Sequence, residues 1–257
     1  MDILPSLTAI NFDLFLMLFG VAMLAGCIDA IAGGGGLLTI PALLWAGLSP
    51  LQALATNKLQ ASFGSFTATW NYSRQGLIKP SEHRAAIILS FLGAISGAWT
   101  VQKIDPAFLA QLIPILLMAF ALYFMFSPKL GEQERAQRIS KNAFAVTAGF
   151  GIGFYDGFFG PGTGTFFVIA FVTLLGYSLP KATAGTKLLN FTSNIASLIL
   201  FAFSGHILWI LGLTMGVGQI IGSFIGSKLA IRHGVQLIRP LLVIVSLLVS
   251  LRLLLQT

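Results

Sequence analysis

The stretch Gly47–Gln60, GLSPLQALATNKLQ, recurs in the second half of the chain as Gly176–Leu189, GYSLPKATAGTKLL. The match is ordered, because glycine, serine, alanine, lysine and leucine return at a constant shift of 129 residues (187 minus 58, and 176 minus 47). Upstream of each copy an aspartate precedes a glycine-rich run. These pairs are Asp29 with Gly33–Gly36 and Asp156 with Gly160–Gly164. Such a series across half of the chain indicates an internal duplication.

The composition of the chain is that of a membrane protein. Of its 257 residues 56% are hydrophobic and 9% are charged, whereas a soluble domain carries about 25% charged residues. Most of its apolar segments approach the roughly 20 residues that cross a bilayer as a helix. Short segments of alternating hydrophobicity, typical of a membrane β-barrel, are not visible. An all-α polytopic membrane protein is therefore expected. The expected segments are 12–32, 36–47, 51–73, 84–103, 107–127, 142–160, 164–176, 181–204, 207–230 and 235–255.

Two segments, 36–47 and 164–176, are too short to span comfortably and are predicted to be broken or re-entrant helices. The polar stretch 129–141 is predicted to be a cytoplasmic linker between two five-segment transmembrane repeats, 1–128 and 142–257.

Basic residues predict the orientation of the repeats. The loop after the third segment is basic and the equivalent loop of the second half is not, whereas the loop after the fourth segment shows the opposite bias. Because positive charge favours the cytoplasm, this reversal predicts inverted repeats with both termini in the periplasm. The basic residues are Arg74, Lys79 and Arg84 in one loop and Lys228, Arg232 and Arg239 in the other.

Lys58 and Lys187 occupy matching positions inside apolar segments. A lysine at the centre of a membrane helix is unfavourable by about 2.5–3.5 kcal/mol, unless its long side chain reaches an interface. Polar residues at helical spacing favour a different interpretation, a polar pathway along each segment. They are Ser62, Ser65 and Thr69 beside Lys58, and Asn190, Asn194 and Ser197 beside Lys187.

The glycine runs separate a long apolar segment from a short one in each half. If the short segments begin as half-helices, their first N–H groups are unsatisfied and form an anion site. Close helix packing through small residues is the alternative. It is the interpretation preferred for Gly93, Gly97, Gly218, Gly222 and Gly226.

Asp29 and Asp156 could pair with the lysines, cap the turns that follow, bind a coupling proton, or be solvated near segment ends. No enzyme motif or His/Cys metal cluster is present, so neither catalysis nor a cofactor is expected. Cys27 has no second cysteine with which to form a disulfide. The net charge is +7, and the basic residues cluster in the loops between apolar segments. This distribution is typical of a protein in a lipid bilayer, so no nucleic-acid partner is expected.

The quoted stretches resemble the TauE/SafE family of membrane transporters, and within it the YfcA-like branch. They are IDAIAGGGGLLTIPALLWAGLSPLQALATNKLQ and YDGFFGPGTGTFFVIAFVTLLGYSLPKATAGTKLLN, and the resemblance covers essentially the whole chain. It implies transport of a small anion, sulfur-containing as in sulfite or a sulfonate, across the bacterial inner membrane. By resemblance the family's repeated motifs fall on Gly33, Gly34, Gly35, Gly36, Asn57, Lys58, Gly162, Thr163, Gly164, Thr186 and Lys187.

The resulting hypothesis is a secondary transporter that works by alternating access. Lys58 and Lys187 would supply positive charge, the N–H groups after the glycine runs would bind oxygens, and Asn57, Thr186 and Asn190 would donate hydrogen bonds. One alternative is a proton or cation pathway through Asp29 and Asp156, and another is a non-transporting scaffold subunit. The substrate, the direction and the oligomeric state stay open, with a homodimer as one option.

Overall fold

A computed structural model of the protein describes residues 12–126 and 136–233. The predicted tenth segment, 235–255, and most of the predicted linker, 129–141, lie outside the described residues. Every regular element in the described ranges is a helix, so the expected all-α class is confirmed there. The elements are α1 (Phe12–Ala32), α2 (Gly36–Trp45), α3 (Pro50–Arg74), a 3₁₀ turn (Pro80–His83), α4 (Arg84–Val101), α5 (Pro106–Phe126), α6 (Lys141–Phe144), a π turn (Ala145–Gly149), α7 (Phe150–Phe158), α8 (Thr163–Leu174), α9 (Leu179–Ala202) and α10 (Trp209–His233).

The repeated sequence Gly-x-Ser sets the start of α3 and of α9. Gly47 and Gly176 have φ values of 88° and 71°, a left-handed conformation that only glycine adopts without strain. Ser49 then caps α3, since its Oγ accepts from the backbone N–H of Gln52 and the Gln52 side chain accepts from the Ser49 N–H. Each helix also has a proline in its first turn, where a missing N–H costs nothing. Ser178 makes no such cap on α9. The features that the two helix starts share are therefore the left-handed glycine and the proline.

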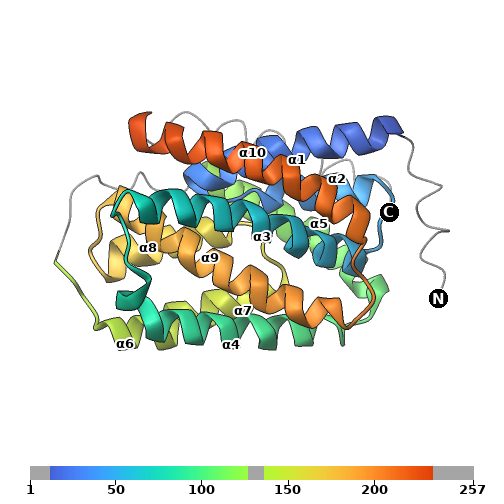
Figure 1. The fold of residues 1–257 in the computed structure, drawn as a ribbon. Helices are drawn as coiled ribbons and strands as arrows, with labels where there is room; N and C mark the ends of the chain where they lie inside the picture. Colours follow the sequence, from blue (N-terminus) through green and yellow to red (C-terminus); the bar gives the residue numbers. More distant parts are fainter. Residues whose placement is uncertain (1–11, 127–135, 234–257) are drawn as a thin grey trace.

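Helices α3 and α9 lie side by side at the centre of the bundle and run in opposite directions (Figure 1). At one end the backbone N–H of Leu208, just after α9, donates to Thr56 Oγ1 of α3 at 3.1 Å. At the other end Tyr72 of α3 packs in one apolar cluster with Ala184 and Leu188 of α9. The start of each central helix is thus next to the end of the other.

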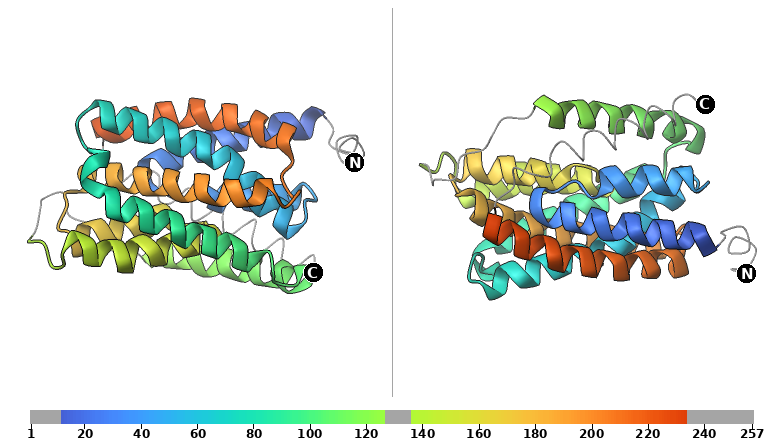
Figure 2. Two further views of the ribbon diagram at one scale, coloured as in Figure 1. Left: turned by 60° about the horizontal axis from the view of Figure 1, so that its bottom comes forward. Right: turned by 90° about the horizontal axis from the view of Figure 1, so that it is seen from above.

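Two outer pairs flank the centre, α1 along α10 and α4 along α7, and Figure 2 shows α1 and α10 together in its right-hand view. Glycines bring these helices into backbone contact. A Cβ added to Gly222 would overlap the Met23 carbonyl oxygen, and one added to Gly97 would overlap that of Phe154. Close packing, the interpretation preferred for these glycines, is therefore confirmed. Each outer pair joins a helix of the first half to one of the second, so the halves interlock.

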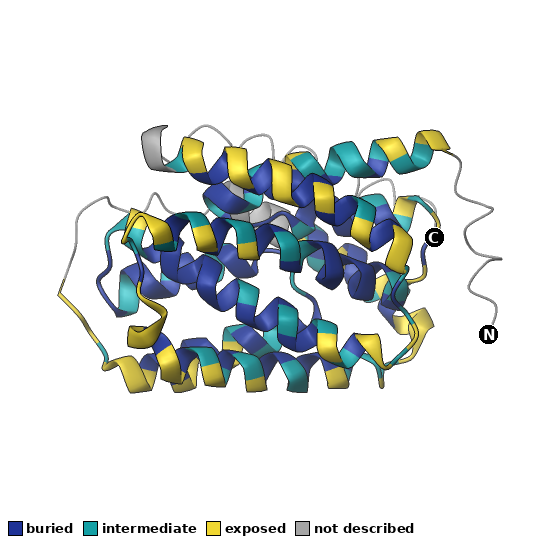
Figure 3. Cartoon of the chain, viewed as in Figure 1, coloured by how far each residue is buried: buried dark blue, intermediate teal, exposed yellow. Residues whose placement is uncertain are grey.

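Burial falls from the centre of the bundle to its outside (Figure 3). Within the described ranges, three stretches are long and apolar enough to cross a membrane, Phe12–Ala32, Pro80–Val101 and Trp209–Ala230. Their outer faces expose large apolar side chains, as a lipid-facing surface requires. Examples are Leu16, Leu24, Ile88, Leu92, Ile220 and Phe224.

Candidate functional site

The breaks between α1 and α2 and between α7 and α8 meet at the centre of the bundle. A Cβ added to Gly33 would lie 2.6 Å from the Cα of Gly164, and one added to Gly36 would lie 3.3 Å from the Cα of Pro161. Thr165 Oγ1 of α8 donates to the Ala32 carbonyl at the end of α1, at 3.0 Å. The contact needs glycine, because any side chain at position 33 would enter the opposite backbone. The two glycine runs that the sequence placed in corresponding positions thus form one junction.

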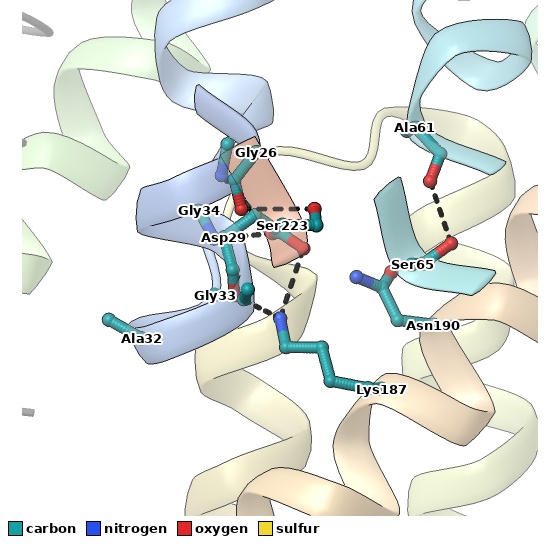
Figure 4. Close-up of polar contacts among 12 residues, drawn as sticks. Gly26, Asp29, Ala32, Gly33, Gly34, Ala61, Ser65, Lys187, Asn190 and Ser223 are labelled. Atoms are coloured by element: carbon teal, nitrogen blue, oxygen red, sulfur yellow. Dashed lines mark hydrogen bonds and ion pairs between the residues drawn. The ribbon is translucent and has the colours of Figure 1, made fainter. Parts of the chain in front are cut away.

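Two buried ion pairs cross this junction reciprocally. Lys58 Nζ of α3 lies 2.9 Å from Asp156 Oδ1 of α7, and Lys187 Nζ of α9 lies 3.0 Å from Asp29 Oδ2 of α1. Figure 4 shows Lys187 reaching from its helix to Asp29. The lysine side chains are 1% and 0% exposed, so the snorkelling alternative is wrong. Each lysine of one half is paired inside the protein with the aspartate of the other half.

The backbone explains why a lysine is suited to each of these positions. Besides the carboxylate, each ammonium group donates to the main-chain carbonyl of its aspartate, Lys58 to Asp156 and Lys187 to Asp29. These carbonyls lie in the last turns of α1 and α7, at the negative ends of the helix dipoles. The Asp29 carbonyl also accepts from the backbone N–H of Gly33 at 2.9 Å. One lysine thus satisfies a carboxylate and a helix end together, which offsets the cost of burying its charge.

The remaining carboxylate oxygens stabilise the breaks. Asp29 Oδ1 accepts from the N–H groups of Gly34 and Gly35 at 3.1 and 3.2 Å. Asp156 accepts from the hydroxyls of Thr163 and Ser193. Pairing and capping, two of the roles considered for these aspartates, are therefore both seen, and Asp156 is not solvated. Asp29 is the more open of the two, with 17% of its side chain exposed against 3% for Asp156.

A small polar cavity of about 30 Å³, partly open to the exterior, lies beside the junction. Its wall combines backbone of the two breaks with polar side chains from α1, α3, α7, α8, α9 and α10. The side chains are Asp29, Asn57, Asp156, Thr163, Asn190, Asn194 and Gln219, and the small residues are Gly34, Gly35, Gly36, Ala61, Gly160, Gly162 and Gly164.

Hydrogen bonds orient the amides of this wall. Asn57 Oδ1 accepts from Thr39 Oγ1 at 2.6 Å and from Gln60 Nε2 at 2.9 Å. Asn190 Oδ1 accepts from Asn194 Nδ2 at 3.4 Å. With the oxygens engaged, each Asn keeps its Nδ2 donor for the cavity that both residues line. The wall therefore offers donors, while the charges of its two carboxylates are balanced by two lysines.

The backbone adds two donors to this wall. Within the described ranges, no hydrogen-bond acceptor is found for the N–H groups of Gly36 and Gly164, in the first turns of α2 and α8. Both residues line the cavity. These are the unsatisfied groups that a half-helix start predicts.

The structure brings most, not all, of the predicted residues to the cavity. Lys58 and Lys187 do not line it, because their ammonium groups are directed to the aspartates. Thr186 does not line it either. It is next to Lys187 on α9, about 100° around the helix, and its buried hydroxyl has no hydrogen-bond partner in the described chain. Gly33 packs against Gly164 instead. The predicted residues that do line it are Gly34, Gly35, Gly36, Asn57, Gly162, Thr163, Gly164 and Asn190, together with Asp29 and Asp156.

Four cavity residues were not among the predicted site residues, Gly160, Ala61, Asn194 and Gln219. Asn194 was on the polar face of its segment, and Gln219 is a polar residue inside the apolar segment 207–230. Both signals were in the sequence. Ala61 gave none, because an alanine in a membrane helix is unremarkable until its neighbours are known.

Comparisons with known proteins place the chain among membrane transporters. The model of the family described as sulfite exporter TauE/SafE matches residues 18–253. The chain is 51% identical over 254 residues to the "Probable membrane transporter protein YfcA" of Escherichia coli (strain K12), covering 99% of this chain and 94% of the relative. It is 47% identical over 241 residues to a "Probable membrane transporter protein" of Haemophilus influenzae, covering 94% of both. No solved structure matches. The chain therefore belongs to the sulfite exporter TauE/SafE family of membrane transporters.

Proposed function

We propose that the central cavity is the substrate site of a secondary transporter for a small anion, a sulfur oxyanion such as sulfite or a sulfonate. The observation that carries the proposal is the set of oriented donors, Asn57 and Asn190 with the free N–H groups of Gly36 and Gly164, in a wall whose carboxylates are neutralised. The printed description of the family supports the sulfur chemistry.

Charge balance decides how such a site treats an anion. Two unpaired aspartates would repel it, and burying an anion without donors costs several kcal/mol. Here each carboxylate has a lysine at about 3 Å, and the half-helix N–H groups carry partial positive charge. The lysines thus act indirectly, by neutralising the negative charge of the carboxylates. The sequence had suggested that they contact the substrate directly.

The reciprocal architecture supports alternating access by inverted repeats. The central helices are antiparallel, and each ion pair joins the start of one break to the other half. Rocking one half against the other around such a centre exposes the cavity to each side in turn.

The distribution of charge supports a cytoplasmic position for one end of the bundle. Arg74, Lys79 and Arg84 gather where α3 leads into α4, at the left in Figure 1, beside the start of α6. Glu82 and Lys141 meet there at 3.6 Å, and Asn71 bonds Ser227 near the end of α10 at 2.7 Å. In an inner membrane this end would face the cytoplasm.

The test is flux of labelled sulfite or a sulfonate into liposomes containing the purified protein. Asn57→Leu and Asn190→Leu should each lower flux at least about tenfold, since a hydrogen bond to a charged group contributes about 1.5–3 kcal/mol. Gln102→Leu is the matched control, because Gln102 Nε2 donates to the Ala98 carbonyl away from the cavity. Unchanged flux in both Asn variants, with the protein folded, would overturn the proposal.

A second candidate is a proton or cation pathway, favoured by the exposed part of Asp29 in the cavity wall. Liposomes without permeant anions separate the two. A cation pathway conducts there, and the anion transporter does not.

A further inference from the structure

Gln219 is a buried polar side chain on α10 that the ion pairs do not use. It lines the cavity and is 3% exposed. Its amide makes no hydrogen bond with any residue that the structure describes. Because the side chain lines the cavity, its amide is open there to a water molecule or a ligand. An amide that found neither would be costly.

Two glycines form the seat of this side chain. A Cβ added to Gly26 of α1 would lie 2.8 Å from Gln219 Oε1, and one added to Gly64 of α3 would overlap the same oxygen. One turn along α10, Ser223 Oγ donates to the Gly26 carbonyl at 3.1 Å (Figure 4), which locks the register of α10 on α1. The carbonyl end of the amide lies between two helices, so its Nε2 donor is the end left for the cavity.

The two halves of the chain differ at the positions that correspond to Gln219 and Gly64. Pairing Gly218–Gly222 with Gly93–Gly97 puts Ala94 at the position of Gln219, and the shift of 129 (193 minus 64) puts Ser193 at that of Gly64. On α9, the Ser193 hydroxyl donates to Asp156. At the corresponding position on α3, Gly64 has no side chain and leaves space for the Gln219 amide.

We infer that Gln219 is a specificity-determining residue of the anion site, an inference that rests on the proposed function. It supplies a third side-chain amide donor, from α10, beside Asn57 of α3 and Asn190 of α9. Three side-chain amides from three helices, added to the N–H groups of Gly36 and Gly164, favour a head group with three oxygens over one with two. Sulfite and sulfonates have three oxygens, whereas sulfinates and carboxylates have two. A site that hydrogen-bonds a polar group of its ligand binds an analogue without that group more weakly, because one buried donor of the protein then stays unpaired.

The experiment compares affinities for ethanesulfonate and ethanesulfinate, which differ by one oxygen, from ligand-dependent melting of the purified protein. Gln219→Met keeps an unbranched chain of similar size and removes the donor. Gly64→Ala keeps the amide but places a methyl group where the Gln219 Oε1 atom lies. Gln102→Leu is the control. Both test variants should lose about tenfold or more of sulfonate affinity and little sulfinate affinity, so that the ratio falls, while the control keeps the ratio.

The outcomes separate this inference from the proposed function. If the unaltered protein is stabilised by neither ligand, nor by sulfite, the anion site itself is wrong and this inference fails with it. If it is stabilised and the affinity ratio is the same in Gln219→Met and Gly64→Ala, the role of Gln219 alone is wrong. If one variant does not fold, the ratio in the other decides.

Discussion

Lys58 and Asp156 are 98 residues apart in the chain and form a buried ion pair at 2.9 Å. Lys187 and Asp29 repeat the arrangement from the opposite halves at 3.0 Å. The pairs hold the two helix breaks together and leave the cavity beside them close to neutral, with amide and backbone donors in its wall. Stability and substrate recognition are therefore linked at one place, and separate variants can distinguish them.

Removing one partner of the Lys58–Asp156 pair should destabilise the fold more than removing both. Lys58→Met leaves a buried carboxylate unpaired, at a cost of about 3–5 kcal/mol. Lys58→Met with Asp156→Asn should recover part of that loss. Melting of the purified proteins measures the cycle, and a double variant less stable than the single one would contradict the pairing.

The two ion pairs should differ in strength. Asp29 is 17% exposed and also accepts two backbone N–H bonds, whereas Asp156 is 3% exposed. An unpaired carboxylate at position 29 keeps more of its solvation, so Lys187→Met should lower the melting temperature less than Lys58→Met. Equal shifts would show that the exposure of Asp29 has no energetic consequence.

The glycine contacts between outer helices predict a sharp contrast among alanine substitutions. Gly222→Ala and Gly97→Ala insert a methyl group into a facing backbone and should cost about 1–3 kcal/mol or more. Gly20→Ala and Gly151→Ala lie in α1 and α7 with nothing within 4 Å of the new Cβ. These controls should be neutral or stabilising by up to about 1 kcal/mol, given the helix propensity of alanine. Thermal melting of the four variants is the measurement, and equal effects would refute the contacts.

Thr39 should act as a positioning residue for Asn57. Its hydroxyl holds Asn57 Oδ1 at 2.6 Å, so Thr39→Val removes the bond while keeping the shape. We expect weaker anion binding with a loss of about 1 kcal/mol or less in stability. Thr39→Ser should restore binding, and a purely structural role would show no such rescue.

The orientation of the bundle can be tested by labelling. In a Cys27→Ser background, Ser81→Cys places a thiol in the exposed turn at the basic end, and Lys103→Cys places one at the opposite end. A membrane-impermeant maleimide applied to intact cells should label position 103 and spare position 81. The reverse pattern would overturn the predicted topology.

Much of the fold follows from local sequence. Apolar length sets the helices. Gly47, the Ser49 cap and a proline set where α3 begins, and a glycine and a proline recur at the start of α9. The glycine runs place the two breaks at their observed positions. These features depend on interactions within a few residues or on the bilayer as a solvent, so a linear pattern carries them.

The partners of the buried charges were beyond such reasoning. The sequence showed Lys58 and Lys187 at matching positions and Asp29 and Asp156 before the breaks. It left open whether the lysines reach the interface, the aspartates or a substrate. Interlocking of the halves decided it, because each lysine reaches the carboxylate and the carbonyl at a helix end of the other half. Gln219 shows the same limit, since its place depends on space left by Gly26 and Gly64 on two other helices. The helices and their breaks can thus be predicted from the linear pattern alone. Which polar groups neutralise one another and which face the cavity cannot, because that depends on contacts between residues far apart in the chain.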